Sequence, residues 1–278
     1  MTGIERIAEA FEAASASGRR AALMPYMMGG FPDLETSRRI GLAYAESGAD
    51  LVELGVPFSD PLADGPVIHA AGTAALRAGI NLHDVLEVGR AISEHVPVAV
   101  MCYANLIFAR GLERFADALL DAGASGLIVP DLPLEEAAGV LDACDGRGLA
   151  LVPLVAPTTP DERLARIGAQ ARGFLYAVSV TGTTGERASV ADGLAGVVGR
   201  AAANTAVPVA VGFGISTAAQ AAAAADAGAD GVIVGTRLVR AAGERGMGGA
   251  GGVGGDPVPA VGALVRELSR GLATRPLS

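Results

Sequence analysis

Eight short, continuously apolar runs recur along the chain and alternate with segments of helical periodicity. Continuous apolar runs are typical of parallel strands that helices cover on both faces. No Gly-x-Gly-x-x-Gly motif follows the first run, as a dinucleotide-binding open sheet would have. We therefore predict an α/β protein with a single closed (β/α)8 (TIM) barrel domain over residues 1–278, with an open doubly wound sheet as the alternative. The predicted strands cover residues 21–28, 49–54, 96–103, 126–129, 150–155, 173–179, 207–212 and 231–235.

Helices are predicted between these strands, with an extra amphipathic helix before the first strand. Three helix-to-strand junctions share the form x-Gly-Ala-Asp/Ser, at residues 47–50, 122–125 and 227–230. Glycine ends a helix at such a position because it adopts a positive φ without steric cost. Residues 246–255 are glycine-rich but lack the Lys and Ser/Thr of a phosphate loop, so we predict a flexible surface insertion. The predicted helices cover residues 4–16, 34–47, 70–79, 82–95, 111–122, 134–147, 159–168, 190–203, 217–227 and 258–272.

Composition narrows the possible functions. The net charge of −9 argues against a nucleic-acid binder, which needs a basic surface to neutralise phosphates. No apolar run approaches the ~20 residues of a membrane span, and residues 1–20 lack the apolar core of a secretory signal. The two cysteines, Cys102 and Cys144, are spaced like neither a zinc site nor a disulfide framework. We therefore expect a soluble cytoplasmic protein with no membrane or nucleic-acid partner.

Residues 51–68, LVELGVPFSDPLADGPVI, place carboxylates where a barrel carries its active site. Glu53 lies inside an apolar run, where an unpaired carboxylate is costly to desolvate, and Asp64 lies in the loop that follows. Active sites of such barrels form at the carboxyl ends of the strands. We therefore predict a carboxylate-lined site that works by general acid–base catalysis and holds no metal. The alternative is that Glu53 reaches solvent or a salt-bridge partner at the strand end.

Three loops rich in Gly and Thr follow the sixth, seventh and eighth predicted strands. Their sequences are VTGTTG at residues 180–185, GFGIS at 212–216 and GTR at 235–237. Glycine lets backbone amides approach phosphate oxygens, and a helix N-terminus favours an anion. A phosphate site in the loops after strands seven and eight recurs in these barrels. The three loops together predict phosphate binding, with ordinary tight turns as the alternative.

Residues 53–66, ELGVPFSDPLADGP, resemble the signature of the tryptophan synthase alpha chain family. Further matching segments are YAN at 103–105, PDLP at 130–133, TGTTG at 181–185 and VGFGI at 211–215. The resemblance implies a (β/α)8 lyase that cleaves indole-3-glycerol phosphate to indole and glyceraldehyde 3-phosphate by a retro-aldol reaction. It also implies an α2β2 heterotetramer, in which a partner beta chain holds pyridoxal phosphate and condenses indole with serine to L-tryptophan. This chain itself is expected to hold no cofactor.

The resemblance also implies roles for individual residues. Glu53 is expected to be the general acid–base, which protonates indole C3 and then takes a proton from the glycerol hydroxyl. Asp64 is expected to accept the indole N–H and to stabilise the positive charge that develops on the ring. The chain contains no lysine, which excludes an aldolase that works through an iminium. The expected binding residues are Tyr26, Met101, Leu127 and Tyr176 for the substrate, Thr184, Gly185, Gly214, Gly235 and Thr236 for the phosphate, and Asp60 for the surface that faces the beta chain.

Two positions depart from the family pattern. The family often has Ser where Thr236 stands, and some relatives carry Arg in place of Val180. Serine and threonine both offer an amide and a hydroxyl, so we expect little loss of phosphate binding at Thr236.

Three other functions stay open: a stand-alone indole-3-glycerol-phosphate lyase, a phosphosugar isomerase or epimerase, and a non-catalytic regulatory barrel subunit. The last needs a broken acid–base pair, whereas both carboxylates are present here.

Overall fold

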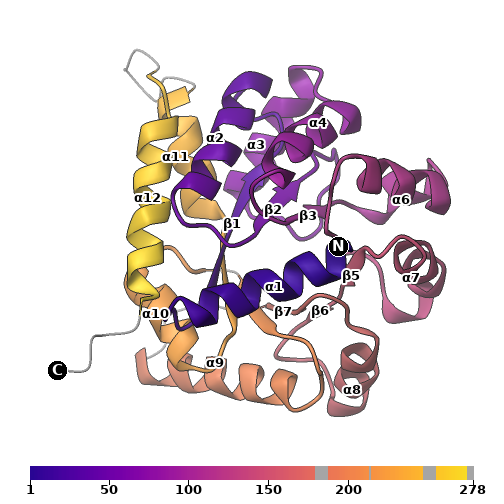
Figure 1. The fold of residues 1–278 in the computed structure, drawn as a ribbon, viewed down its shortest axis with the longest axis vertical. Helices are drawn as coiled ribbons and strands as arrows, with labels where there is room; N and C mark the ends of the chain where they lie inside the picture. Colours follow the sequence, from indigo (N-terminus) through magenta and orange to yellow (C-terminus); the bar gives the residue numbers. More distant parts are fainter. Residues whose placement is uncertain (179–186, 213, 247–254, 274–278) are drawn as a thin grey trace.

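A ring of parallel strands lies inside a shell of helices (Figure 1). The computed structural model describes residues 1–178, 187–212, 214–246 and 255–273. In that part of the chain every strand pair is parallel. The strands are β1 (Ala22–Met28), β2 (Val52–Gly55), β3 (Val98–Met101), β4 (Gly126–Ile128), β5 (Ala150–Val152), β6 (Leu154–Val155), β7 (Leu175–Val178), β8 (Val209–Gly212) and β9 (Gly231–Val234). Their hydrogen-bonded order is β5-β4-β3-β2-β1-β9-β8-β7-β6.

The barrel closes through one interrupted strand. β5 pairs with β4 and β6 pairs with β7, and only Pro153 separates β5 from β6 in the chain. Proline has no N–H to donate, so the ladder breaks there, while the Pro153 carbonyl still accepts a hydrogen bond from the Tyr176 amide at 3.0 Å. The two pieces form the fifth strand predicted at residues 150–155. The predicted (β/α)8 barrel is therefore confirmed.

Most helices lie where the sequence predicts them, with three differences. α3 begins at Pro66, because Gly65 and a proline in the first turn favour a helix start there. The helix predicted at 134–147 is divided into a 3-10 turn, η1, and α7. α5 and α11 are not predicted. The helices are α1 (Gly3–Ala16), α2 (Leu34–Glu46), α3 (Pro66–Arg77), α4 (Leu82–Ser93), α5 (Ala104–Phe108), α6 (Leu112–Asp121), η1 (Leu134–Glu136), α7 (Ala138–Asp145), α8 (Asp161–Gln170), α9 (Arg187–Ala202), α10 (Ala218–Asp226), α11 (Thr236–Gly246) and α12 (Val258–Gly271).

The three x-Gly-Ala-Asp/Ser junctions adopt the predicted left-handed conformation at glycine. The aspartates of two junctions also tie neighbouring strands together at their amino ends. The Asp50 carboxylate accepts a hydrogen bond from the Leu23 amide at 2.8 Å, and the Asp230 carboxylate accepts one from the Val209 amide at 2.8 Å. The values of φ are +98° at Gly48, +71° at Gly123 and +95° at Gly228.

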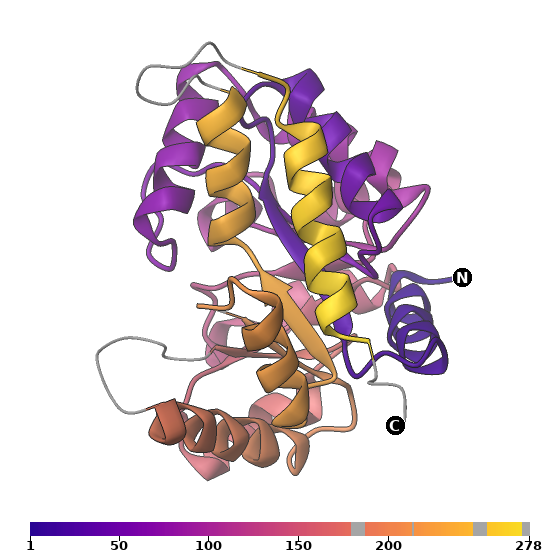
Figure 2. The ribbon, with the colours of Figure 1, turned by 90° about the vertical axis from the view of Figure 1, so that its left-hand side faces the viewer.

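One end of the barrel is closed by α1, the predicted extra N-terminal helix. This helix crosses the strands in Figure 1 and lies at one edge of the molecule in Figure 2. It buries Ile7 and Phe11, and the Phe11 ring centroid lies 6.0 Å from that of Phe174 in the barrel interior. Of the described helices, none is both long and apolar enough to span a membrane. With α1 over the amino ends of the strands, the carboxyl ends are left to form the functional site.

Candidate active site

A cavity of about 790 Å³ opens at the carboxyl ends of the strands. Strand residues form its floor and walls, and the loops that follow the strands form its rim. The side chains from strands are Tyr26, Glu53, Met101, Ile128, Leu154, Tyr176 and Ile233. The rim includes Ala63, Asp64, Gly65, Gly214, Ile215, Ser216, Gly235, Thr236, Arg237 and Arg240. Eight of the sequence-predicted site residues therefore converge on one cavity, as the barrel fold requires: Tyr26, Glu53, Asp64, Met101, Tyr176, Gly214, Gly235 and Thr236.

Glu53 is a buried carboxyl group inside this cavity. Its neighbours Val52 and Leu54 pack outward under the helices, so strand alternation turns Glu53 inward. The side chain is only 2 % exposed, and among the described residues Oε2 has no hydrogen-bond partner. Burial, with the charge of Asp64 as the smaller cause, raises the pKa of Glu53 to about 8. A carboxyl group with this pKa holds a proton at neutral pH and can both donate and accept one. The alternative of a solvent-exposed or ion-paired Glu53 does not hold in the described structure.

Asp64 faces the same cavity from the loop before α3. Partial burial raises its pKa, while the Tyr103 hydroxyl and His69 act in the opposite direction. Since Asp64 immediately precedes the cap of α3, the helix dipole also favours a negative charge here. The two carboxyl groups thus differ: Glu53 is buried with Oε2 unpaired among the described residues, whereas Asp64 has a donor and a nearby histidine.

Two tyrosines extend into the cavity in the same manner. A Cβ atom added at Gly55 would lie 2.2 Å from Tyr26 Oη, and one added at Gly212 would lie 2.2 Å from Tyr176 Oη. Each hydroxyl therefore rests on a glycine of the next strand, where no larger residue fits. Burial raises the pKa of both tyrosines well above the ordinary value. Both hydroxyl groups stay neutral, so these side chains offer ring surface and neutral polar atoms.

Leu127 does not line the cavity, and the prediction for this residue is wrong. Its side chain is 1 % exposed and packs in the layer between strands and helices. Ile128, the next residue of β4, faces the barrel interior and lines the cavity. Successive side chains of a strand point to opposite faces, so an error of one residue in register exchanges a wall residue for a core residue.

The opposite rim of the cavity has the features of an anion site. Gly214 has φ of +78°, and α11 begins at Thr236, directly after Gly235. The first amides of a helix have no partner inside it and carry partial positive charge. Two arginines also line the cavity beside this helix start: Arg237, which belongs to the GTR loop but was not predicted as a binding residue, and Arg240, which no sequence signal indicated. Arg237 is engaged, donating to the Ser216 carbonyl at 2.5 Å and pairing with Glu267 at 3.2 Å.

The remaining predicted residues lie elsewhere. Thr184, Gly185 and Val180 lie outside the described residues, as do positions 247–254 of the glycine-rich segment. Asp60 is exposed on the loop after β2 and accepts a hydrogen bond from the Ser59 hydroxyl at 2.5 Å. Asp131, from the PDLP segment that resembles the family pattern, lines a neighbouring cavity of about 510 Å³. Within the described part of the chain, no cluster of His, Cys, Asp or Glu could hold a metal ion.

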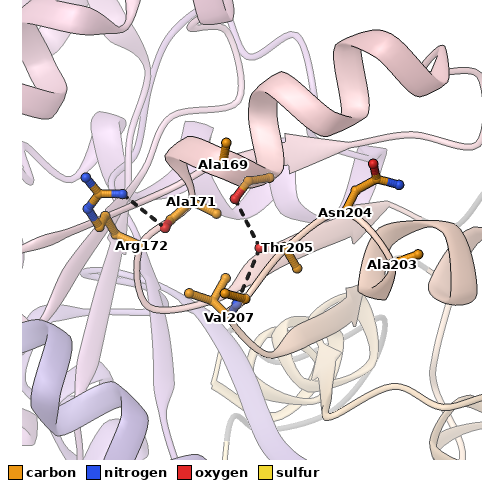
Figure 3. Close-up of a pocket in the computed structure, with 9 residues that line it drawn as sticks. Ala169, Ala171, Arg172, Ala203, Asn204, Thr205 and Val207 are labelled. Carbon is orange, nitrogen blue, oxygen red and sulfur yellow. Dashed lines mark hydrogen bonds between the residues drawn. The ribbon is translucent and has the colours of Figure 1, made fainter.

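A further hollow of about 610 Å³ lies at the amino ends of the strands, between the ends of α8 and α9. Figure 3 shows hydrogen bonds between several of the residues that line it. The Thr205 hydroxyl donates to the Gly168 carbonyl at 3.2 Å and accepts from the Val207 amide at 3.4 Å. The Arg172 guanidinium pairs with Asp145 at 3.1 Å. This hollow has none of the carboxylates found at the other end, and we assign it no chemistry.

Comparisons with known proteins agree on one family. The family model described as "Tryptophan synthase alpha chain" matches residues 11–250. The tryptophan synthase alpha chain of Synechococcus elongatus is 45% identical over 273 residues, which cover 98% of both chains. That of Prochlorococcus marinus is 50% identical over 236 residues, which cover 84% of this chain and 86% of the relative.

Solved structures give the same result. Tryptophan synthase from M. tuberculosis, in an open form with BRD0059 bound, superposes with a TM-score of 0.86 at 39% identity, covering 97% of this chain and 99% of that chain. The tryptophan synthase complex from Pyrococcus furiosus superposes with a TM-score of 0.78 at 32% identity, covering 89% of this chain and 97% of that chain.

Proposed function

This chain belongs to the tryptophan synthase alpha chain family, and we propose that Glu53 and Asp64 are the two groups with which it cleaves its substrate. As a member of this family, it converts indole-3-glycerol phosphate to indole and glyceraldehyde 3-phosphate, and the beta chain uses the indole to make L-tryptophan. One observation supports the two residues above all. A buried carboxyl group with a pKa of about 8 shares a cavity with a second carboxyl group, opposite a helix start.

The carbon–carbon bond to be broken joins indole C3 to the glycerol chain. Protonated Glu53 donates its proton to C3, and the ring becomes a positively charged indoleninium. Asp64 accepts the hydrogen bond of the indole N–H and stabilises this charge. The Glu53 carboxylate then takes the proton of the adjacent hydroxyl group, which becomes the aldehyde. The bonding electrons return to the ring, indole leaves, and Glu53 is protonated again.

The remaining cavity residues bind and orient the substrate in this proposal. Amides of Gly214, Gly235 and Thr236 hold the phosphate, together with Thr184 and Gly185. The indole ring lies among apolar and aromatic walls, where excluded water strengthens the charge interactions of the two carboxylates. The proposed wall residues are Tyr26, Met101, Ile128, Leu154 and Tyr176.

The chain works with a beta chain in an α2β2 assembly, as the family does. We propose that Asp60, exposed on the loop that also carries Asp64, belongs to the surface that faces this partner. We also propose that pyridoxal phosphate is held by the beta chain and not by this one. The chain has no lysine with which to hold that cofactor as a Schiff base. The proposed location of the assembly is the cytoplasm.

Indole release from indole-3-glycerol phosphate, with and without the beta chain, tests the function directly. We expect steep activation by the beta chain, whereas high turnover of the isolated chain would indicate a stand-alone lyase. Glu53→Gln should lower kcat by about a thousandfold or more, because it removes the proposed proton carrier, while glyceraldehyde 3-phosphate still binds. Asp64→Asn should lower kcat by about a hundredfold, because it weakens charge stabilisation without removing the proton carrier. Retained turnover in Glu53→Gln would refute the assignment.

A further inference from the structure

Tyr103 contacts the loop that carries Asp64 at three points. Its ring stacks on Phe58 with 5.0 Å between centroids and an angle of 21°. Its hydroxyl oxygen accepts a hydrogen bond from the Ala63 amide at 3.1 Å, and it interacts with the Asp64 carboxylate. Burial raises the pKa of Tyr103 to about 12, so the neutral hydroxyl can donate to Asp64 while accepting from Ala63. One side chain thus joins the backbone and the carboxylate of neighbouring loop residues.

The loop has few other ties to the barrel. Its start is held where the Val56 amide donates to the Met101 carbonyl at 2.8 Å. Beyond that, the hydrogen bonds within the described part of the chain link residues 57–63 to another segment only through Ala63 and Tyr103. Leu62, next to Ala63, is 84% exposed. The position of Asp64 therefore depends strongly on Tyr103.

Tyr103 is itself fixed from the next strand. The Asp131 carboxylate, which follows β4, accepts a hydrogen bond from the Ala104 amide at 2.9 Å. Ala104 is the first residue of α5 and Tyr103 is its cap, so Asp131 satisfies an otherwise unpaired amide at the helix start. The contacts run from the end of β4, through the end of β3, to the loop after β2. Tyr103 is not among the residues that line the active-site cavity, so it contacts Asp64 from outside the cavity lining.

We propose that Tyr103 is a positioning residue, which holds residues 57–64 so that the Asp64 carboxylate faces Glu53, and that Asp131 fixes the backbone of Tyr103. The role in catalysis rests on the function proposed above. The geometry of the loop does not, because the hydrogen bonds and the ring contact exist without substrate.

Tyr103→Phe distinguishes the contribution of the hydroxyl from that of the ring, since phenylalanine lacks the hydroxyl but keeps the stacking on Phe58. In the ligand-free protein, hydrogen exchange of the amides in residues 57–65 should become about tenfold faster or more, because the Ala63 amide loses its acceptor. Exchange in α12 should stay unchanged. Tyr44→Phe is the matched control: it removes another buried hydroxyl, which donates to the Tyr26 carbonyl at 3.3 Å from α2, and should leave residues 57–65 unchanged. Equal exchange of this segment in Tyr103→Phe and wild type would overturn the proposal.

Kinetics with indole-3-glycerol phosphate and the beta chain give a second readout. We expect kcat of Tyr103→Phe to fall about tenfold with KM changed less than threefold, the effect of one hydrogen bond to a charged group in the transition state. The acid limb of the kcat profile should move to higher pH, because Asp64 loses the hydroxyl that stabilises its ionised form. The other titratable groups near Asp64 are Glu53 on β2, Tyr26 on β1 and His69 on α3, and all three are kept. An unchanged kcat and acid limb would overturn the catalytic part.

Asp131 provides an independent pair of variants. Asp131→Ala removes the acceptor for the Ala104 amide and should speed exchange in residues 57–65, as Tyr103→Phe does. Asp131→Asn keeps an acceptor oxygen and should restore most of the protection. If wild type released no indole, the proposed function would fail, while the exchange measurements would still decide whether Tyr103 holds the loop.

Discussion

Glu53 and Asp64 lie in one cavity, but their surroundings favour different protonation states of the two carboxyl groups. Glu53 is buried in an interior that offers it no donor among the described residues, so its proton is held to about pH 8. Asp64 sits at the loop–helix boundary, where Tyr103 and His69 favour its ionised form. A retro-aldol cleavage needs a group that gives and takes a proton and a second group that stays charged. The two environments match these two needs.

The burial of Glu53 predicts a pH-dependent cost in stability. Its pKa is raised from 4.5 to about 8 on folding, so between these values the folded state binds more protons than the unfolded state. The free energy of unfolding therefore falls as pH rises through this window. Glu53→Gln removes the cost, and we expect its free energy of unfolding to exceed that of wild type by about 4 kcal/mol at pH 8, with no gain at pH 4. Urea unfolding at both pH values measures this, and parallel pH profiles for the two proteins would contradict it.

At the scale of elements, glycines at helix ends and glycines inside helices have opposite roles. Gly228 ends α10 with φ of +95°, a conformation that costs an L-residue about 1–2 kcal/mol. Gly199 lies in α9 without a positive φ, and a Cβ added there meets nothing within 4 Å. Replacing glycine by alanine should therefore change the free energy of unfolding in opposite directions at these two positions.

We predict that Gly228→Ala lowers the free energy of unfolding by about 1–2 kcal/mol. Gly199→Ala should raise it by about 0.5–1 kcal/mol, because alanine restricts the unfolded chain and favours the helix. Thermal and urea unfolding of the two variants beside wild type measure the difference. Stabilisation by Gly228→Ala would show that the junction does not require the left-handed conformation.

α11 is the element that completes the proposed phosphate site. It begins at Thr236 without a preceding loop, so the helix start lies at the end of β9 and beside the cavity. Arg237 is committed to Ser216 and Glu267. Arg240, one turn further along the helix, lines the same rim. The chain carries a net charge of −9, so local cations at this rim matter for attracting an anionic substrate.

We expect Arg240→Gln to raise KM for indole-3-glycerol phosphate about threefold to tenfold with little change in kcat, because the arginine attracts the phosphate and takes no part in the chemistry. The difference from wild type should shrink as ionic strength rises from 0.02 to about 0.5 M, where charges are screened over a few ångströms. Arg38→Gln, an exposed arginine on α2 that pairs with Glu35, is the control of equal charge. A KM effect of the same size in both variants would show that only the net charge matters.

At the scale of the whole molecule, the two ends of the barrel have different roles. The amino end contributes to stability, and the carboxyl end carries the proposed chemistry. α1 closes the amino end through Ile7 and Phe11, and the Gly-Ala-Asp junctions tie the strands there. The carboxyl end carries the cavity and the proposed catalytic groups. Because the main core lies between strands and helices, the carboxyl end of the barrel can carry costly features such as the buried carboxyl group of Glu53 on β2.

This division predicts the effect of Phe11→Ala. Phe11 is 8% exposed and contacts Phe174, so its loss leaves a cavity and should lower the free energy of unfolding by about 3–4 kcal/mol. We expect kcat with the beta chain to stay within about twofold of wild type at a temperature where the variant remains folded. Urea unfolding and steady-state kinetics test both parts. A large fall in kcat of the folded variant would show that the two ends are coupled.

The sequence predicted the barrel because its signals are local and repeated. Each apolar run, helical segment and helix-ending glycine is encoded within about ten residues. α5 and α11 were missed because α5 is a single short turn and α11 begins directly after a strand, with no separate start signal. The division of the fifth strand at Pro153 follows from the missing N–H of proline, but which piece pairs with which neighbour depends on barrel closure.

The fold class, the family and the two carboxyl groups of the proposed site are predictable from local sequence, since a fourteen-residue signature and the strand pattern carry that information. Which side chains face the cavity is visible only in the folded barrel, because a shift of one residue in strand register exchanges Leu127 for Ile128. The tertiary structure also decided the burial that raises the pKa of Glu53, and it placed Tyr103 and Asp131 behind Asp64. These properties arise from contacts between segments that are far apart in the chain, and no local pattern encodes such contacts.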